Sequence, residues 1–407
     1  MSYLLGVILF AVAIGLSIAL HEFGHLLTAK SFGMKATRYF IGFGPRLWSF
    51  HRGETEYGIA AIPAGGYVKI VGMTHLEEVP EEDDARAFWR FPAWKRVVVM
   101  SAGSVTHFAL AIVVLYLAAV SVGLPLDRAT VSQVAPCVVP HGEKSGALRD
   151  CKPTDPRSPA SQAGLRPGDR IVRLDRTKID SYTQLVTEIR SRPDQTVTLS
   201  YVRNGRTQSR SVHLAAVFRA PLSGEKADPK TGLVRVGAVG IAAAPTQKFG
   251  ALGGVGATGD YTGTLVTGTF TAIKSFPAKV PKLVDALSGQ RRDPNTPVSV
   301  VGVSRVGGQA IAAGSWLVFL LLLASFNIFV GVFNMFPLLP LDGGHVAILL
   351  FEKARSRIAR ALGRADPGRV DLNKLVPIAF LVIALFGGIS LLTILADFVN
   401  PIQNPFK

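Results

Sequence analysis

The sequence is poor in charged residues. Asp, Glu, Lys and Arg make up 18% of the 407 residues, whereas hydrophobic residues make up 48%. An ordinary soluble protein has about 25% charged residues. The shortage of charge therefore excludes an ordinary soluble protein and predicts a polytopic membrane protein with one or more soluble segments.

Acidic residues are also scarce, and the formal net charge is +16. Strongly basic chains often bind polyanions. Here the basic residues are spread over every polar segment and no stacking motif accompanies them, so we expect no nucleic-acid partner. Anionic lipid and topology signalling explain the charge instead. No repeat or low-complexity segment is present.

Long hydrophobic runs, in contrast, are present. A membrane-spanning helix needs about 20 predominantly apolar residues. The first run lacks the basic start and the small-residue cleavage site of a secretory signal peptide. We therefore predict four transmembrane helices, at Leu4 to Leu27, Val97 to Leu124, Ser315 to Leu341, and Leu375 to Ala396.

The short connectors predict the orientation of these helices. Residues 30–96 contain ten Lys or Arg and residues 343–374 contain seven, whereas the stub before the first span contains none. Loops rich in Lys and Arg stay in the cytoplasm. Both connectors are thus expected inside, with the two termini and residues 125–314 outside.

The first span ends in an ionisable motif, His21-Glu22-Phe23-Gly24-His25. Histidines four residues apart lie on one helix face, so both imidazoles can reach one zinc ion. The glutamate can act as general base toward water at the metal. Ionisable residues inside a span mark functional sites. The motif predicts a zinc site near the cytoplasmic leaflet; the alternative is a helix end that meets lipid headgroups.

The third span ends in further polar residues and two helix-breaking prolines: Asn327, Asn334, Pro337, Pro340 and Asp342. The first and third spans run in the same direction, so their ends meet at one leaflet. Asp342 is then expected at the depth of His21 and His25. Two histidines and a carboxylate with an open fourth position form a catalytic zinc pattern. The alternative for Asp342 is a helix cap.

The roles of two other histidines are left open by the sequence. His107, in the second span, is either a third metal ligand or a packing and hydrogen-bonding residue between helices. His345 is expected to support the site or to cap a helix.

Residues 35–72 predict a β-hairpin or meander, with turns at Arg52-Gly53 and at Pro63 to Gly66. An exposed strand edge beside the zinc could hold a substrate as an added strand. The alternative is a hairpin that serves packing only. The segment Gly42-Phe43-Gly44-Pro45 is apolar but breaks helix periodicity, and we expect it to dip into the membrane surface.

The outer segment predicts a compact β-rich domain. A capping box at Ser181 opens a helix, and Asn204-Gly205 marks a hairpin turn. Cys137 and Cys151 both lie on the oxidising side, which suggests a disulfide; two free thiols are the alternative.

The expected fold is a polytopic α-helical membrane protein with four transmembrane helices, a cytoplasmic-side β-hairpin or meander, and an exoplasmic β-rich domain. We predict an amphipathic helix at Gly268 to Leu287 and a short extended run at Pro297 to Val303. The predicted segments are 1–29 (helix 1), 30–96 (cytoplasmic loop with hairpin), 97–124 (helix 2), 125–246 (outer domain), 247–314 (outer amphipathic linker), 315–342 (helix 3), 343–374 (cytoplasmic loop), and 375–407 (helix 4 and tail).

Together these motifs resemble the site-2 protease family over nearly the whole chain. The order of strands and the stretch Ala163 to Ile171 resemble a bacterial PDZ domain. The motif Asn-x-x-Pro-x-x-Pro-Leu-Asp-Gly-Gly at residues 334–344, paired with the histidine motif, carries most of the family resemblance. The one-PDZ branch, which cleaves membrane-anchored anti-sigma factors, is the most similar.

The resemblance implies one Zn²⁺ per chain, held by His21, His25 and Asp342, with Glu22 as the base. It implies substrate contacts at Asn334, at Gly343 and Gly344, and at the hairpin residues Gly42, Phe43 and Gly44. One departure is visible: the family often has Gly-Pro-x-x-Asn where this chain has Gly103-Ser104-Val105-Thr106-His107.

The expected function is an intramembrane zinc endopeptidase of a bacterial plasma membrane. Its partners would be the lipid bilayer, a single-span membrane protein already shortened by another protease, and a peptide at the PDZ domain. The PDZ domain could equally act as a steric gate. Rival interpretations are a catalytically silent PDZ scaffold with structural zinc, against which the intact Glu22 argues, and a metal transporter, which would need more intramembrane carboxylates and histidines.

Overall fold

The computed structural model describes residues 2–73, 79–125, 127–138, 151, 155–219, 221–222, 228, 233–243, 246–288, 292 and 296–402. The chain forms two compact units. Unit 1 comprises Met1–Gly123 and Lys248–Lys407, and unit 2 comprises Leu124–Gln247. Parts of the predicted outer domain and the end of the C-terminal tail lie outside the described residues.

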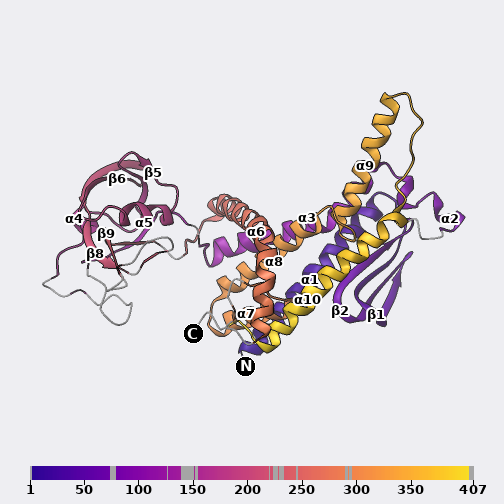
Figure 1. The fold of residues 1–407 in the computed structure, drawn as a ribbon, viewed down its shortest axis with the longest axis horizontal. Coiled ribbons are helices and arrows are strands. Elements are labelled where there is room, and N and C mark those ends of the chain that lie inside the picture. Colours follow the sequence, from indigo (N-terminus) through magenta and orange to yellow (C-terminus); the bar gives the residue numbers. More distant parts are fainter. Residues whose placement is uncertain are drawn as a thin grey trace. The chain divides into compact units, whose positions relative to one another are not determined.

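Unit 1 contains the four predicted membrane spans. Among the described residues, four helical segments are long and apolar enough to cross a membrane: α1 (Ser2–Ser31), α3 (Ala93–Ser121), α8 (Trp316–Asn334), and Asn373–Val399, which includes α10 (Val376–Val399) and all but the first residue of η2 (Leu372–Leu375). Helix α3 packs against both α1 and α8, as can be followed in Figure 1. The prediction of four helices able to span a membrane is confirmed for the described residues.

The third span ends earlier than predicted. Helix α8 stops at Asn334, and Asp342 is instead the first residue of a separate helix, α9 (Asp342–Ala361). Pro337 and Pro340 lie between them, and proline cannot supply the amide that a continuous helix needs. The predicted loop 343–374 is therefore largely helical, and α9 projects from the unit (Figure 1).

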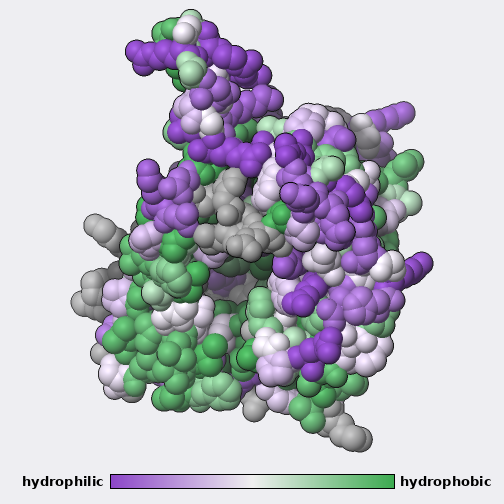
Figure 2. Space-filling view, turned by 90° about the vertical axis from the view of Figure 1, so that its right-hand side faces the viewer, coloured by the Kyte–Doolittle hydropathy of each residue, from purple (hydrophilic) through white to green (hydrophobic). Residues whose placement is uncertain are grey.

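The surface of this side of unit 1 is divided by polarity. In Figure 2, hydrophilic residues gather at the top, on the projecting end of α9, and run down the right-hand side, whereas hydrophobic residues gather at the lower left and along the bottom. Such a division is what a boundary between lipid and water produces, because apolar side chains that face hydrocarbon need not be buried in protein.

The predicted outer linker, 247–314, differs from expectation. The helix predicted from Gly268 begins earlier, at Ala251, because the Gly- and Thr-rich residues before it are part of one long helix, α6 (Ala251–Leu287). Low helix propensity is overridden here because small residues allow close packing. A Cβ atom added at Gly254 would lie 2.9 Å from the Val120 side chain of α3.

The short extended run predicted at Pro297 to Val303 is also wrong. Helix α7 (Val300–Ala312) begins there, capped by the Ser299 hydroxyl, which accepts from the amides of Val301 and Gly302. Helix α7 packs on α1: a Cβ atom at Gly307 would lie 2.6 Å from Phe10. Part of the predicted linker thus belongs to the helix bundle.

The predicted hairpin is a bent two-strand sheet, β1 (Ala36–Arg52) and β2 (Thr55–Ile70). Residues 38–41 of β1 pair on one side with 56–59 and on the other with 66–69, because both strands fold back on themselves. Gly42 and Gly44 have φ angles of 92° and 83°, which allow the bend in β1. Residues 66–70 form one outer edge, and no further strand pairs with it in the described part of the chain.

Short segments join the sheet to α3. They are α2 (Glu81–Asp84) and η1 (Phe88–Arg90). The guanidinium of Arg86 donates to both carboxylate oxygens of Glu54, at 2.6 and 2.8 Å. These contacts tie the connector to the turn between β1 and β2.

Unit 2 is β-rich, as predicted. A four-stranded sheet, in the order β5-β4-β6-β7, accompanies two two-stranded sheets, β10-β3 and β8-β9. The hairpin turn at Asn204-Gly205 and the helix cap at Ser181 are both confirmed. Cys137 and Cys151 are joined by a disulfide. The elements are β3 (Val131–Val134), α4 (Pro159–Gln162), β4 (Arg170–Leu174), β5 (Thr177–Lys178), α5 (Tyr182–Arg190), β6 (Thr196–Arg203), β7 (Arg206–His213), β8 (Ala215–Arg219), β9 (Val234–Ala238) and β10 (Ile241–Ala243).

Candidate metal centre

Three side chains meet inside unit 1 where α1, α3 and the start of α9 come together. The Nε2 atoms of His21 and His25, on successive turns of α1, are 3.2 Å apart. Each lies 3.4 Å from Oδ2 of Asp342. Both histidines are buried, and Asp342 is half-buried. The structure thus brings together the three residues that the sequence predicts as ligands.

The spacing of these atoms fits a tetrahedral metal. Zinc binds histidine nitrogen and carboxylate oxygen at about 2.0–2.1 Å, so two ligand atoms of a tetrahedron lie roughly 3.3–3.4 Å apart. The three observed separations have this size. Oδ2 of Asp342 is buried and has no hydrogen-bond partner in the described structure. A buried acceptor without a donor is costly, and a cation between the three groups would satisfy it.

Helix α3 fixes the orientation of the imidazoles. Nδ1 of His25 lies 2.7 Å from the carbonyl oxygen of Val99, so this nitrogen carries the proton and Nε2 is left as an acceptor. Gly103 lies against both rings: a Cβ atom there would be 2.4 Å from Cε1 of His21 and 2.5 Å from Nε2 of His25. Only glycine allows α3 to approach this closely.

His107 belongs to a polar network beside the centre. Its Nδ1 atom lies 2.8 Å from Oδ1 of Asn327 in α8, and Asn327 donates to the Ser17 hydroxyl at 3.2 Å. All three residues are buried. The ring of His107 lies 4.9 Å from that of His21 between centroids. The structure therefore gives His107 the packing and hydrogen-bonding role, and it does not join the ligand group.

Asp342 is positioned by the two glycines that follow it. A Cβ atom at Gly343 would lie 2.3 Å from the backbone of Met335, and one at Gly344 would lie 2.7 Å from that of Leu338. The missing side chains let α9 begin directly against the turn that follows α8. Both glycines thus have a packing role in the structure, and their substrate contact stays a prediction.

Glu22 lies beside the three ligand-type residues and interacts electrostatically with all of them. Its carboxylate has no hydrogen-bond partner in the described part of the chain, so it is free to accept a proton. Gly66, the first residue of the outer edge of the sheet, lies against Glu22: a Cβ atom at Gly66 would be 2.8 Å from Cγ of Glu22. An extended chain along residues 66–70 would therefore pass the glutamate.

The other predicted substrate residues lie in three surroundings. Asn334 is half-buried at the end of α8, and its amide has no partner in the described structure. Gly42 fits closely under the carbonyls of Ala60 and Ile62. Phe43 is 43% exposed and stacks on Tyr67, and Gly44 is also exposed. The hairpin residues therefore shape the bend of the sheet, and their contact with substrate stays a prediction.

The sequence interpretation did not single out Gly66 or the bond between His107 and Asn327. The sequence does contain a signal for the bond between His107 and Asn327, since a histidine in one span and an asparagine in another must each find a polar partner. Nothing local indicates which one. Gly103 stands in the sequence only as the first residue of the segment that departs from the family motif.

The fold and the site define a class: a membrane protein with a buried His, His, Asp centre and a free glutamate beside it, as in metal-dependent hydrolases. A family model described as Peptidase family M50 matches residues 9–365. The chain belongs to this family, and the resemblance to site-2 proteases is confirmed.

Similar proteins are known over the full length. Zinc metalloprotease Rip1 of Mycobacterium bovis is 38% identical over 407 residues, covering 99% of each chain. Zinc metalloprotease Rip1 of Mycolicibacterium smegmatis is 39% identical over 413 residues, again covering 99% of each chain. Metalloprotease MmpA of Caulobacter vibrioides is 29% identical over 383 residues, covering 87% of this chain and 88% of that protein.

Proposed function

We propose that this chain is an intramembrane zinc endopeptidase in which His21, His25 and Asp342 hold the metal and Glu22 is the general base. The observation that carries the proposal is the triangle of ligand atoms, 3.2, 3.4 and 3.4 Å on its sides, with the unpartnered Glu22 carboxylate next to it. The M50 family match and the zinc metalloprotease relatives support it.

The chemistry needs few groups. Bound by these three side chains, zinc supplies a Lewis acid that polarises the scissile carbonyl and makes water more acidic. Glu22 accepts the proton of the attacking water and later delivers it to the leaving amine. The carbonyl oxygen of Val99 holds His25 in the required tautomer.

The substrate binds as an extended strand. A helix hides its peptide carbonyls in internal hydrogen bonds, so a membrane-spanning substrate must unwind locally before cleavage. Strand addition at residues 66–70 supplies main-chain partners to the unwound segment, and Gly66 brings it to Glu22. The free amide of Asn334 can hold the same segment from α8.

Loop charges support a topology with the metal centre near the cytoplasmic leaflet and unit 2 outside. Unit 2 acts there as a PDZ domain, which either binds a peptide or excludes substrates with a bulky outer domain. The substrate is then a single-span membrane protein, such as an anti-sigma factor, after a first protease has shortened it.

Two substitutions test the mechanism separately from metal binding. Glu22→Gln keeps the shape of the side chain but cannot accept a proton, so it should retain zinc and lose cleavage of a truncated single-span protein in proteoliposomes. Asp342→Asn should lose both, because a ligand is replaced. Zinc is measured by elemental analysis and cleavage by electrophoresis.

Each outcome is decisive. Retained cleavage by Glu22→Gln would show that Glu22 is not the general base. Unchanged zinc in Asp342→Asn would remove Asp342 from the ligand set. Wild-type protein that binds zinc but cleaves no truncated substrate would favour the PDZ scaffold, and zinc flux across the membrane would favour a transporter.

A further inference from the structure

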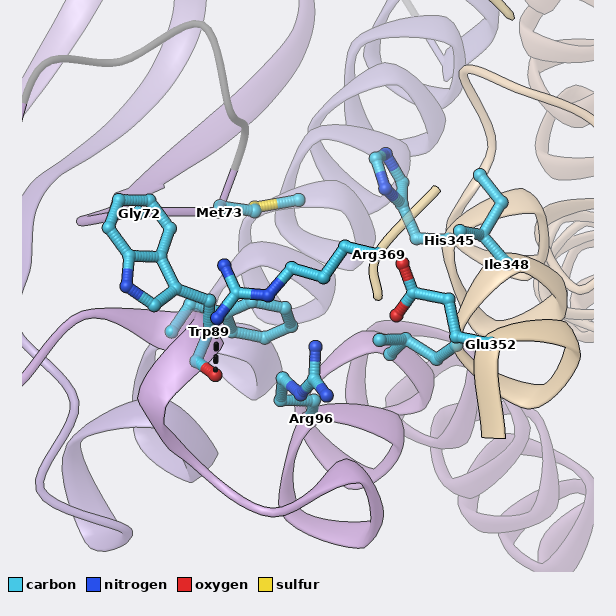
Figure 3. A pocket seen from close by; sticks show the side chains of 10 residues that line it. Gly72, Met73, Trp89, Arg96, His345, Ile348, Glu352 and Arg369 are labelled. Carbon is cyan, nitrogen blue, oxygen red and sulfur yellow. Dashed lines mark hydrogen bonds between the residues drawn. The ribbon is translucent and has the colours of Figure 1, made fainter. Parts of the chain in front are cut away.

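A second cavity lies near the start of α9, separate from the metal centre. Its volume is about 40 Å³, and it is formed by the start of α3, the connector before α3, α9 and the segment that follows α9. One water molecule needs about 10–15 Å³ by this measure, so the cavity has room for a small polyatomic group. Its polar lining comes from Arg96, Arg369, Glu352 and His345, beside Trp89 (Figure 3).

Positive charge in this cavity is incompletely paired. The Nε atom of Arg96 is buried and has no hydrogen-bond partner in the described structure. Arg369 makes one long hydrogen bond, 3.4 Å, to the carbonyl oxygen of Trp89, and its guanidinium lies 5.6 Å from the centre of the Trp89 ring. Figure 3 shows both arginine side chains projecting into the same space.

Glu352 does not neutralise both arginines. Its carboxylate accepts the amide of Val370 at 2.8 Å. In the described part of the chain it forms no ion pair within 4.0 Å with either Arg96 or Arg369. Two guanidinium groups therefore share the cavity with one carboxylate that is already bonded elsewhere, which leaves an excess of one positive charge.

The cavity lies at the level of lipid headgroups. Arg96 is the fourth residue of the span α3. The ammonium group of the preceding Lys95 lies over the rings of Phe32, Phe91 and Trp94, at 5.3 to 5.7 Å. Aromatic and basic residues gathered at the end of a span are typical of the interface between hydrocarbon and water.

We propose that this cavity binds a phosphate group, supplied by the headgroup of an anionic phospholipid. Guanidinium groups bind phosphate oxygens through paired, charge-assisted hydrogen bonds. Basic pockets between transmembrane helices bind such headgroups. A bound phosphate satisfies the buried Nε atom of Arg96 and bridges the start of α3 to the segment that follows α9.

The test uses the full-length, zinc-loaded protein in a neutral detergent. Phosphatidylglycerol, phosphatidylcholine and inorganic phosphate are titrated separately, and binding is measured by native mass spectrometry and by the shift in Tm. Arg96→Gln and Arg369→Gln each remove one guanidinium. Arg357→Gln, on the exposed face of α9 outside the cavity, is the matched control for loss of one charge.

We expect each cavity variant to bind phosphatidylglycerol at least about tenfold more weakly than wild type, since a hydrogen bond to a charged group is lost and a factor of ten corresponds to about 1.4 kcal/mol. Arg357→Gln should bind within twofold of wild type. If inorganic phosphate gives an Arg-dependent Tm shift and phosphatidylglycerol gives none, the phosphate site stands and its source is free phosphate.

Equal affinity of wild type and both cavity variants would overturn the proposal, as would an equal loss in Arg357→Gln. Arg369 is exposed, so we expect Arg369→Gln to fold, and this variant alone can test the proposal if Arg96→Gln does not fold. The readouts do not involve proteolysis, so this proposal and the proposed function can fail independently.

Discussion

Gly103→Ala is the sharpest test of how the metal centre is built. The added methyl group would lie 2.4 Å from Cε1 of His21, 2.5 Å from Nε2 of His25 and 2.6 Å from Nδ1 of His21. Carbon atoms in contact are normally about 3.5–4.0 Å apart. The rings or the helix must therefore move by about 1 Å.

Such a movement is large for a metal site. Ligand distances have to stay within about 0.2 Å of their ideal values. Loss of an interaction that merely orients a ligand costs about 10–100-fold in metal affinity, and we expect Gly103→Ala to reach at least this range. Overpacking should also destabilise the protein by about 1–3 kcal/mol.

The assay is zinc content of the purified protein after dialysis against a graded chelator series. Gly15→Ala is the matched control, because Gly15 lies in α1 and a Cβ atom there would meet nothing within 4 Å. Helix propensity favours that change by up to about 1 kcal/mol. If Gly103→Ala kept its zinc at the same chelator concentration as Gly15→Ala, the close approach of α3 to the histidines would not be needed.

Two further predictions concern stability. Burial raises the pKa of Asp169, but hydrogen bonds from the Arg203 guanidinium and the Arg166 amide outweigh it and hold the pKa below its usual value. Because the pKa of Asp169 is lower in the folded than in the unfolded protein, its carboxylate stabilises unit 2 at pH values above the unfolded pKa of about 3.9. This stabilisation is lost as the pH falls through the folded-state pKa. Hydrogen exchange of β4 and β6 in the full chain, corrected for intrinsic rates, should show this acid loss in wild type and not in Asp169→Asn; equal profiles would contradict it. Arg292→Met should lower stability by about 3–5 kcal/mol, because it leaves the buried Asp397 carboxylate without its cation. Thermal unfolding in detergent measures this, and an unchanged Tm would refute it.

Local patterns were enough for much of the architecture. Apolar runs indicated all four spans, because a span is defined by length and composition alone. The histidine spacing indicated two ligands on one helix face. Counting spans then brought Asp342 to the same leaflet as His21 and His25, although it is distant in the sequence.

Local patterns failed where packing overrode propensity. The Gly- and Thr-rich start of α6 has weak helix propensity, yet it is helical where Gly254 lies against α3. The short run at the start of α7 predicts an extended segment, but the Ser299 hydroxyl caps a helix there. The break between α8 and α9 was placed too late, although Pro337 and Pro340 signalled it.

The sequence by itself therefore indicated the class of protein, its spans and its candidate metal ligands, since these depend on composition and on regular helical spacing. Only the tertiary structure decided that Gly103 lies against both histidines, that Gly66 brings a free strand edge to Glu22, and that Arg96 and Arg369 share a cavity. Those contacts join segments far apart in the chain, and they depend on close backbone approach, which no local pattern specifies.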